Sequence, residues 1–158
     1  MSPTFQHASR ADTDLLLELV RALYEFEGIA FEVERIRRGL AELMANPHWG
    51  GAWLIRCSGA VVGYFVLAFG FDLEFGGRQA TVTELYLTPE SRRAGTGTAT
   101  LLFVEATLRE LGIGEYELQA DRANVAALAF YRRFGFHIFD RVPMSKSVPM
   151  AKPQSADE

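Results

Sequence analysis

The chain has 158 residues, of which 49% are hydrophobic and 23% are charged, as expected of one compact globular domain. Its formal net charge of −4 gives no electrostatic support for a nucleic-acid partner. The single cysteine, Cys57, excludes an intrachain disulfide, no Cys/His spacing is that of a metal site, and no stretch reaches membrane-spanning length. We therefore expect a cytoplasmic protein with neither a metal ion nor a membrane partner.

Periodic apolar residues predict the secondary structure. The predicted elements are, in chain order, a strand at 5–9, helices at 13–26 and 33–45, strands at 52–57, 60–71 and 79–87, a helix at 97–111, a strand at 116–120, a helix at 124–134 and a strand at 136–142. Asp12 and Thr13 offer N-cap oxygens to the first helix, and Gly28 interrupts it. This order predicts an α/β three-layer or α+β domain with a mixed sheet.

No linker or internal repeat divides the chain. Residues 1–148 are therefore predicted to form a single domain. The last residues, 149–158, are polar and rich in proline, serine and charge, so we expect a disordered C-terminal tail.

A glycine-containing loop between a predicted strand and a predicted helix is the central feature. The loop runs Arg92-Arg93-Ala94-Gly95-Thr96-Gly97-Thr98. The first turn of a helix exposes unpaired N–H groups and partial positive charge, which together suit a phosphate. Gly95 and Gly97 allow the backbone to approach that phosphate closely. The loop has neither the lysine of a nucleotide triphosphatase loop nor the third glycine of a dinucleotide-binding loop.

Two flanking motifs favour a ligand site over a simple tight turn. Upstream, an apolar strand ends in proline, with the sequence Glu84-Leu85-Tyr86-Leu87-Thr88-Pro89. Downstream, Asn124 and Tyr131 are seven residues apart, so two helical turns bring them to nearly the same side of the predicted helix. That helix ends in Phe134-Gly135-Phe136, where Gly135 can adopt positive φ.

With these three blocks in this order and spacing, the sequence resembles the GNAT superfamily of N-acetyltransferases. The resemblance covers the order of elements along the whole chain and is closest over residues 83–136. It implies a three-layer fold with a mixed, mostly antiparallel sheet flanked by helices. It also implies acetyl-CoA as co-substrate and an amine as acetyl acceptor. The position of Arg93 is usually glycine in the superfamily, and that of Ala94 is often basic or glutamine.

The resemblance further implies roles for individual residues. The backbone of Leu85, Tyr86 and Leu87 would pair with the pantetheine arm in the manner of an added strand. The pyrophosphate would be held by the loop, namely by Arg92, Arg93, Ala94, Gly95, Thr96, Gly97 and Thr98. Asn124 would contact the pantetheine region, and Tyr131 would point its hydroxyl at the thioester sulfur.

Transfer to an amine favours a base, because an alkyl ammonium with a pKa near 10.4 is uncharged in roughly one molecule per thousand at neutral pH. Glu84 is the candidate base, with a solvated edge residue as the alternative interpretation. Tyr131 is the candidate acid, with amphipathic packing as the alternative. The candidate acceptor-recognising residues are Tyr24, Glu27, Asp72 and Glu74. Helix packing explains the tyrosine equally well, and solvated surface charge is the favoured interpretation of the three carboxylates.

The sequence thus predicts an acetyl-CoA-dependent N-acetyltransferase that acts on a primary amine of a small molecule or peptide by direct attack. One alternative is an acyltransferase that uses another acyl-CoA. A second is a non-catalytic acyl-CoA sensor or interaction domain. Small members of the superfamily often dimerise, so a homodimer is expected.

Overall fold

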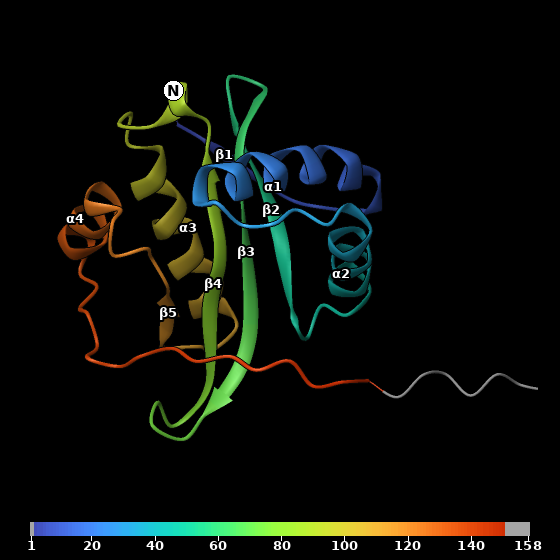
Figure 1. Ribbon diagram of the computed structural model, residues 1–158. Coiled ribbons are helices and arrows are strands. Elements are labelled where there is room, and N and C mark those ends of the chain that lie inside the picture. The colour runs from blue at the N-terminus through green and yellow to red at the C-terminus, as the bar shows by residue number, and fades with distance from the viewer. Residues whose placement is uncertain (1, 151–158) are drawn as a thin grey trace, which may run out of the picture. The chain divides into compact units, whose positions relative to one another are not determined.

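The computed structural model describes residues 2–150. The chain divides into two compact units, Met1–Asp121 and Arg122–Glu158. The first unit contains the five-stranded sheet (Figure 1). The second contains helix α4, Val125–Phe134.

The strands of the sheet are arranged in chain order. They are β1 (Thr4–His7), β2 (Gly50–Cys57), β3 (Ala60–Asp72), β4 (Gly77–Leu87) and β5 (Tyr116–Leu118). Neighbouring strands are antiparallel except β4 and β5, which are parallel. Figure 1 shows β3 and β4 as the long central pair, joined by a hairpin. The predicted mixed, mostly antiparallel sheet is therefore confirmed.

Helices cover both faces of this sheet. Helices α1 (Thr13–Glu27) and α2 (Val33–Ala45) share a core with β2 and β3, in which Leu16, Leu54 and Tyr64 are fully buried. Helix α3 (Thr96–Glu110) packs on the opposite face, where Val104 lies in a second core with Phe65. Apolar residues at helical spacing in α1 and α3 meet the alternating residues of the strands, which is why each helix buries one face.

A β-bulge in β4 determines which face its side chains meet. The register between β3 and β4 shifts at Thr83, between the pairs formed by Val82 and by Glu84. Val82 packs into the α3 core, so strict alternation would place Glu84 on the α3 face as well. The extra residue reverses this alternation: Leu85 packs into the α3 core, and Glu84 faces α1 and α2.

The start of α1 differs from the prediction. The Asp12 carboxylate accepts a hydrogen bond from the Ser9 backbone N–H at 2.8 Å, and it makes no side-chain cap on α1. It closes a short 3-10 helix, η1 (Arg10–Asp12), that precedes α1. The Thr13 hydroxyl likewise donates to the Arg10 carbonyl oxygen at 2.8 Å. Asp12 is the N-cap residue of α1, but the side-chain cap predicted for Asp12 and Thr13 does not form, because the side chains of both residues bond to η1 instead.

Glycines with positive φ end two of the helices. Gly28 ends α1 at φ +69°, and Gly135 ends α4 at φ +118°, so both predicted helix stops are confirmed. The strand predicted at 136–142 is wrong, because those residues adopt no regular structure. Alternating apolar residues make a strand only when a neighbouring strand satisfies their backbone groups.

The C-terminal prediction is only partly within the described residues. Residues 149 and 150 have no regular secondary structure. The rest of the predicted tail, 151–158, lies outside the residues that the structure describes. The single domain over 1–148 stays a prediction.

Candidate active site

The outer edge of β4 is open over its last residues. β5 pairs with β4 no further than Val82, so within residues 2–150 no strand lies beside the end of β4. The Thr88 N–H donates to the Val62 carbonyl oxygen of β3 at 2.8 Å. Residue pairs in antiparallel strands alternate between hydrogen-bonded and non-hydrogen-bonded pairs. Since Thr88 is in a hydrogen-bonded pair, Leu87 and Leu85 are in non-hydrogen-bonded pairs, and their N–H and C=O groups point away from β3. An extended ligand can add to this edge as a further strand would.

Tyr86 differs from its two neighbours in β4. It lies opposite Tyr64, and the same alternation directs its backbone groups toward β3. Its side chain is buried in the core under α1 and α2. Of the three residues predicted to pair with pantetheine, only Leu85 and Leu87 therefore present backbone N–H and C=O groups at the open edge.

The first turn of α3 follows β4 after a short 3-10 helix, η2 (Pro89–Ser91), and the glycine-containing loop. Gly95 is its N-cap at φ +82°, and the first intrahelical bond runs from the Ala99 N–H to the Gly95 oxygen at 3.0 Å. No side chain caps this end. The amides of Thr96, Gly97 and Thr98 therefore have no partner within the helix. Together with the helix dipole they make a site suited to phosphate.

The two atypical positions of the loop behave differently. Arg93 adopts φ +64°, the left-handed conformation that glycine usually supplies. The turn is thus preserved, at a backbone cost of about 1–2 kcal/mol for a residue with a side chain. Ala94 is exposed and adds no charge to the loop.

Arg92 links the loop to α1 and β4. Its Nε donates to the Leu87 carbonyl oxygen at 2.9 Å, which occupies one group of the open edge. Its guanidinium lies 5.1 Å from the centre of the Phe26 ring and 5.7 Å from that of Tyr86. Arg92 therefore positions the loop, whatever further contact it makes with a phosphate.

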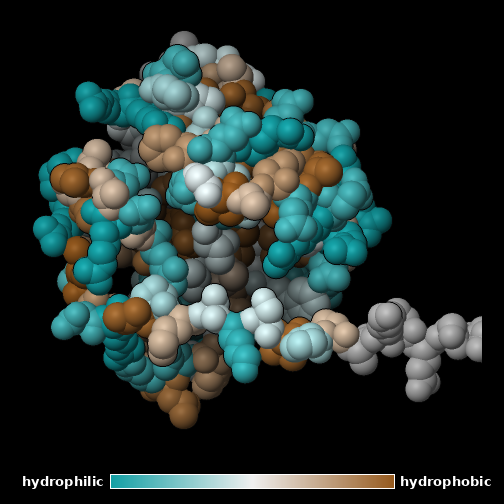
Figure 2. Space-filling view, in the orientation of Figure 1, coloured by the Kyte–Doolittle hydropathy of each residue, from teal (hydrophilic) through white to brown (hydrophobic). Residues whose placement is uncertain are grey.

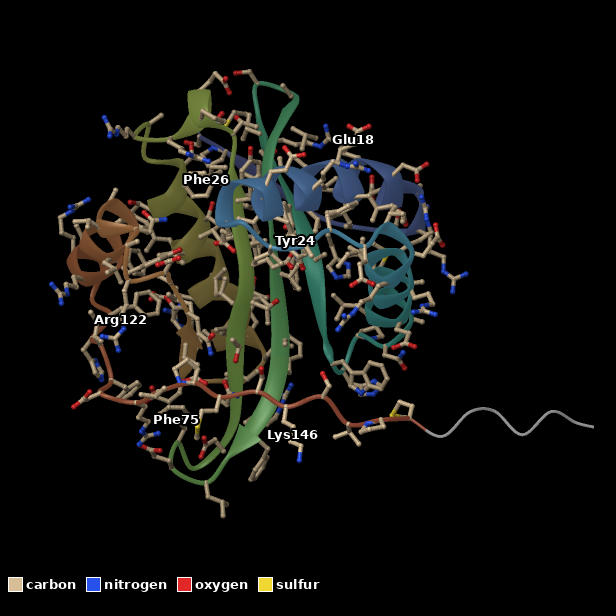
Figure 3. All side chains as sticks on the ribbon, in the orientation of Figure 1. Glu18, Tyr24, Phe26, Phe75, Arg122 and Lys146 are labelled. Carbon is tan, nitrogen blue, oxygen red and sulfur yellow. The ribbon has the colours of Figure 1, made fainter. Side chains whose placement is uncertain are left out.

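Glu84 is held by two tyrosines on the face covered by α1 and α2. The Tyr24 hydroxyl of α1 donates to Oε1 at 2.8 Å, and the Tyr64 hydroxyl of β3 donates to Oε2 at 2.7 Å. Figure 3 shows Tyr24 over the middle of the sheet. The structure thus brings two predicted site residues together, Tyr24 and Glu84. It adds Tyr64, which sequence reasoning missed because its position in a strand resembles any other core position.

Both tyrosines are kept in the protonated form. Burial raises the pKa of Tyr24, and the hydrogen bond to Glu84 and the charge of Glu84 raise it further. Burial also raises the pKa of Tyr64, followed by the charge of Glu84 and the hydrogen bond to it. Both hydroxyls are therefore donors at neutral pH, and Glu84 is the acceptor.

Further carboxylates lie near Glu84. Burial raises the pKa of Glu27, at the end of α1, and the negative charges of Glu84 and then Asp121 add to this effect. Asp121, which follows β5, is a second residue that sequence reasoning did not select. Their shared negative field attracts a cationic group.

Asp72 and Glu74 lie elsewhere. They occupy the β3–β4 hairpin, where the Glu74 N–H donates to Asp72 Oδ1 at 2.8 Å. Asp72 is at the end of β3, and the partner of Glu84, Val66, is near its middle. At about 3.3 Å per residue the two positions are roughly 20 Å apart along the strand. The structure does not bring these carboxylates to Glu84, so their substrate role stays a prediction.

Asn124 and Tyr131 belong to α4. Asn124 is the N-cap, and its Oδ1 accepts from the Ala127 N–H at 3.1 Å, so its side-chain NH₂ is the group left for a ligand. The Tyr131 ring packs edge-on to Phe136, with 5.6 Å between ring centres. Tyr131 is therefore within α4, whereas Asn124 immediately precedes it, and the projection of both side chains to one side stays a prediction.

Apolar side chains are exposed beside Tyr24. Phe26 is 59% exposed and Ile29, in the connection from α1 to α2, is 48% exposed. Figure 2 shows hydrophobic colours over this connection, in contrast to the hydrophilic surface around it. An acceptor that approaches Glu84 from this side meets an apolar rim.

The buried tyrosines predict loss of stability in alkali. An unfolded tyrosine ionises near pH 10, whereas burial and a carboxylate partner raise the pKa values of Tyr24, Tyr64 and Tyr116 in the folded chain. Above pH 10 the unfolded chain releases protons that the folded chain retains, so stability falls as pH rises, and below pH 9 this effect is absent. Urea unfolding at pH 8 to 11 measures this loss of stability. An unfolding midpoint at pH 11 equal to that at pH 8 would contradict the prediction.

Membrane spans and metal clusters are both missing from residues 2–150. No helix there combines the length and apolar character needed to cross a membrane. Nor does this part of the chain contain three or more His, Cys, Asp or Glu side chains placed to hold a metal ion.

An open strand edge followed by the unpaired amides of a helix is suited to an extended, phosphate-bearing ligand. Residues 16–136 match the acetyltransferase (GNAT) family. The chain therefore belongs to the GNAT family of acetyltransferases. No curated protein matches this chain.

Solved structures share the fold. An integron cassette protein from the mobile metagenome of Cole Harbour Salt Marsh is 26% identical with a TM-score of 0.80, over 93% of this chain and 91% of that one. A predicted acetyltransferase with acetyl-CoA from Clostridium acetobutylicum is 20% identical with a TM-score of 0.76, over 91% and 96%. An aminoglycoside acetyltransferase from an uncultured soil metagenomic sample, in complex with sisomicin, is 17% identical with a TM-score of 0.72, over 94% and 97%.

Proposed function

We propose that this chain transfers the acetyl group of acetyl-CoA to a primary amine of a small molecule or peptide. One observation carries the proposal. A single strand, β4, presents an open backbone edge at Leu85 and Leu87, leads into the unpaired amides at the start of α3, and carries Glu84. Membership of the family supports it, as does the acetyl-CoA named with the Clostridium acetobutylicum structure.

The residues present fit the coenzyme. The backbone of Leu85 and Leu87 binds the pantetheine arm, and the amides from Arg93 to Thr98 bind the pyrophosphate. Asn124 contacts the pantetheine region through its NH₂ group. When bound, the coenzyme supplies an acetyl group activated as a thioester.

Glu84 supplies the base. It accepts a proton from the acceptor ammonium, directly or through one water, and the uncharged amine then attacks the acetyl carbon. The new C–N bond forms as the C–S bond breaks, so no enzyme nucleophile takes part. Tyr131 donates its hydroxyl proton to the departing sulfur, and the second proton, which the nitrogen releases as it becomes an amide, restores the Tyr131 hydroxyl through solvent.

The acceptor is a cation in solution. Glu27 and Asp121 add negative charge near Glu84, which favours an acceptor with more than one amine. The amine-rich aminoglycoside named with one neighbour supports this class of acceptor. Exposed Phe26 and Ile29 pack against the apolar part of the acceptor.

Thiol release from acetyl-CoA tests the function. Purified chain is mixed with acetyl-CoA and one of four acceptors: spermidine, sisomicin, a lysine-containing peptide or a simple monoamine. Amine-dependent release, with the acetylated amine seen by mass spectrometry, supports the proposal. Coenzyme binding without thiol release in the presence of any acceptor would favour a non-catalytic acyl-CoA sensor. Turnover only with another acyl-CoA would show that acetyl-CoA is not the acyl donor.

Replacing Tyr131 by phenylalanine is expected to lower kcat about ten-fold or more, because the departing sulfur loses its proton donor. Affinity for coenzyme A, measured by calorimetry, should be unchanged since the ring and its contact with Phe136 remain. Phe130→Leu on the same helix is the control for packing. An unchanged kcat would remove Tyr131 from the mechanism.

A further inference from the structure

The Glu84 carboxylate has a hydroxyl donor on each of its two oxygens. The donors come from different elements, Tyr24 from α1 and Tyr64 from β3, at 2.8 and 2.7 Å. The Tyr64 side chain is fully buried, so neither it nor its hydrogen bond can swing into solvent. Tyr24 is half-buried at the last turns of α1.

Two fixed donors restrict the carboxylate to one orientation. A glutamate has three rotatable bonds and would otherwise sample several rotamers on a half-open surface. Hydrogen bonds from a hydroxyl to an ionised carboxylate are among the stronger ones in proteins. Each oxygen accepts one of them and retains lone-pair capacity for a water or an amine.

We propose that Tyr24 and Tyr64 are positioning residues that hold Glu84 in the orientation in which it receives the proton of the acceptor. This inference rests on the proposed function, since it assigns the two tyrosines their role through Glu84. Neither hydroxyl transfers a proton. Tyr24 also ties α1, and with it the apolar rim at Phe26, to the base on β4.

The role predicts a specific pattern of kinetic effects. Tyr64→Phe and Tyr24→Phe each lower kcat about ten-fold, the effect expected for loss of one hydrogen bond to a charged group. In a Glu84→Gln background the same substitutions change kcat less than about two-fold, because the residue they position is already lost. Affinity for coenzyme A, measured by calorimetry, stays within about two-fold throughout.

A matched control is available on the other side of the sheet. The Tyr116 hydroxyl donates to Glu105 Oε1 at 3.0 Å, which is also a tyrosine–glutamate pair. Tyr116→Phe should leave kcat unchanged. Thermal unfolding of all variants checks the fold, and if Tyr64→Phe does not fold, the half-buried Tyr24→Phe decides alone.

A second readout needs no activity. Urea unfolding at pH 8 of Tyr24→Phe, Glu84→Gln and the double variant forms a double-mutant cycle on the free energy of unfolding. The Tyr24 hydroxyl lies 2.8 Å from Glu84 Oε1, so the double variant should lose less stability than the sum of the two single losses. Strictly additive losses would overturn the contact itself.

The outcomes separate the two proposals. If Glu84→Gln is impaired but both phenylalanine variants retain full kcat, the positioning role is overturned and the proposed function stands. If the phenylalanine substitutions lower kcat by the same factor with Glu84 present and with Glu84→Gln, the tyrosines act independently of Glu84, and the positioning role is again overturned. If Glu84→Gln keeps full kcat, or no acceptor is acetylated, the proposed chemistry has failed and the positioning role fails with it.

Discussion

Replacing Glu84 by glutamine is expected to lower kcat about a hundred-fold or more. Glutamine has nearly the same shape but cannot take up the proton of the acceptor ammonium, and general base catalysis contributes about 10²–10⁴ in rate. Steady-state rates at saturating acetyl-CoA measure the effect. Coenzyme affinity should not change, because the proposed coenzyme contacts are backbone groups of Leu85 and Leu87, and Glu84 faces the opposite side of the strand from their side chains.

The control for this substitution is Glu105→Gln in α3. Glu105 also accepts a hydrogen bond from a tyrosine, Tyr116, but on the other face of the sheet. Its replacement should leave kcat unchanged. If Glu84→Gln were as active as the unmodified chain, the base would have to be another group, and Glu27 would be the next to test.

Replacing Gly97 by valine is expected to weaken coenzyme A binding at least a hundred-fold. Gly97 is the second residue of α3, where we propose that the unpaired amides bind the phosphates, and a branched side chain would keep the phosphates from the backbone. Loss of two hydrogen bonds to a charged group, at about 1.5–3 kcal/mol each, accounts for this factor. Calorimetry with coenzyme A measures it directly.

Gly39→Val is the matched control. Gly39 also lies within a helix, α2, and a side chain at this position has open space around it. Valine is a better helix former than glycine, so neither variant should lose the fold. Normal coenzyme binding by Gly97→Val would show that the phosphates do not bind at the start of α3.

The position of the glycine loop at the start of a helix could be predicted because its signal is local. Gly95 and Gly97 lie at a strand-to-helix junction, and the exposed amides of a first helical turn follow from helix geometry alone. The family could be predicted from the same blocks. The left-handed turn at Arg93 could not, since an arginine at φ +64° has a local cost that the rest of the fold must offset.

The orientation of Glu84 could not be predicted by counting along the strand. The bulge at Thr83 is visible in the sequence only as a change of apolar spacing, from two between Ala80 and Val82 to three between Val82 and Leu85. The partners of Glu84 lie 60 and 20 residues away in the chain. No local pattern relates such distant residues.

By itself the sequence determined the order of most elements, the glycine turns and the acetyltransferase family, because periodicity, positive φ and unpaired helix amides are properties of short segments. It also suggested a final strand at 136–142 that does not form, since alternation does not supply a partner strand. Only the tertiary structure decided that β4 has an open edge and that Glu84 meets Tyr24 and Tyr64. Those features depend on register and on packing between distant segments.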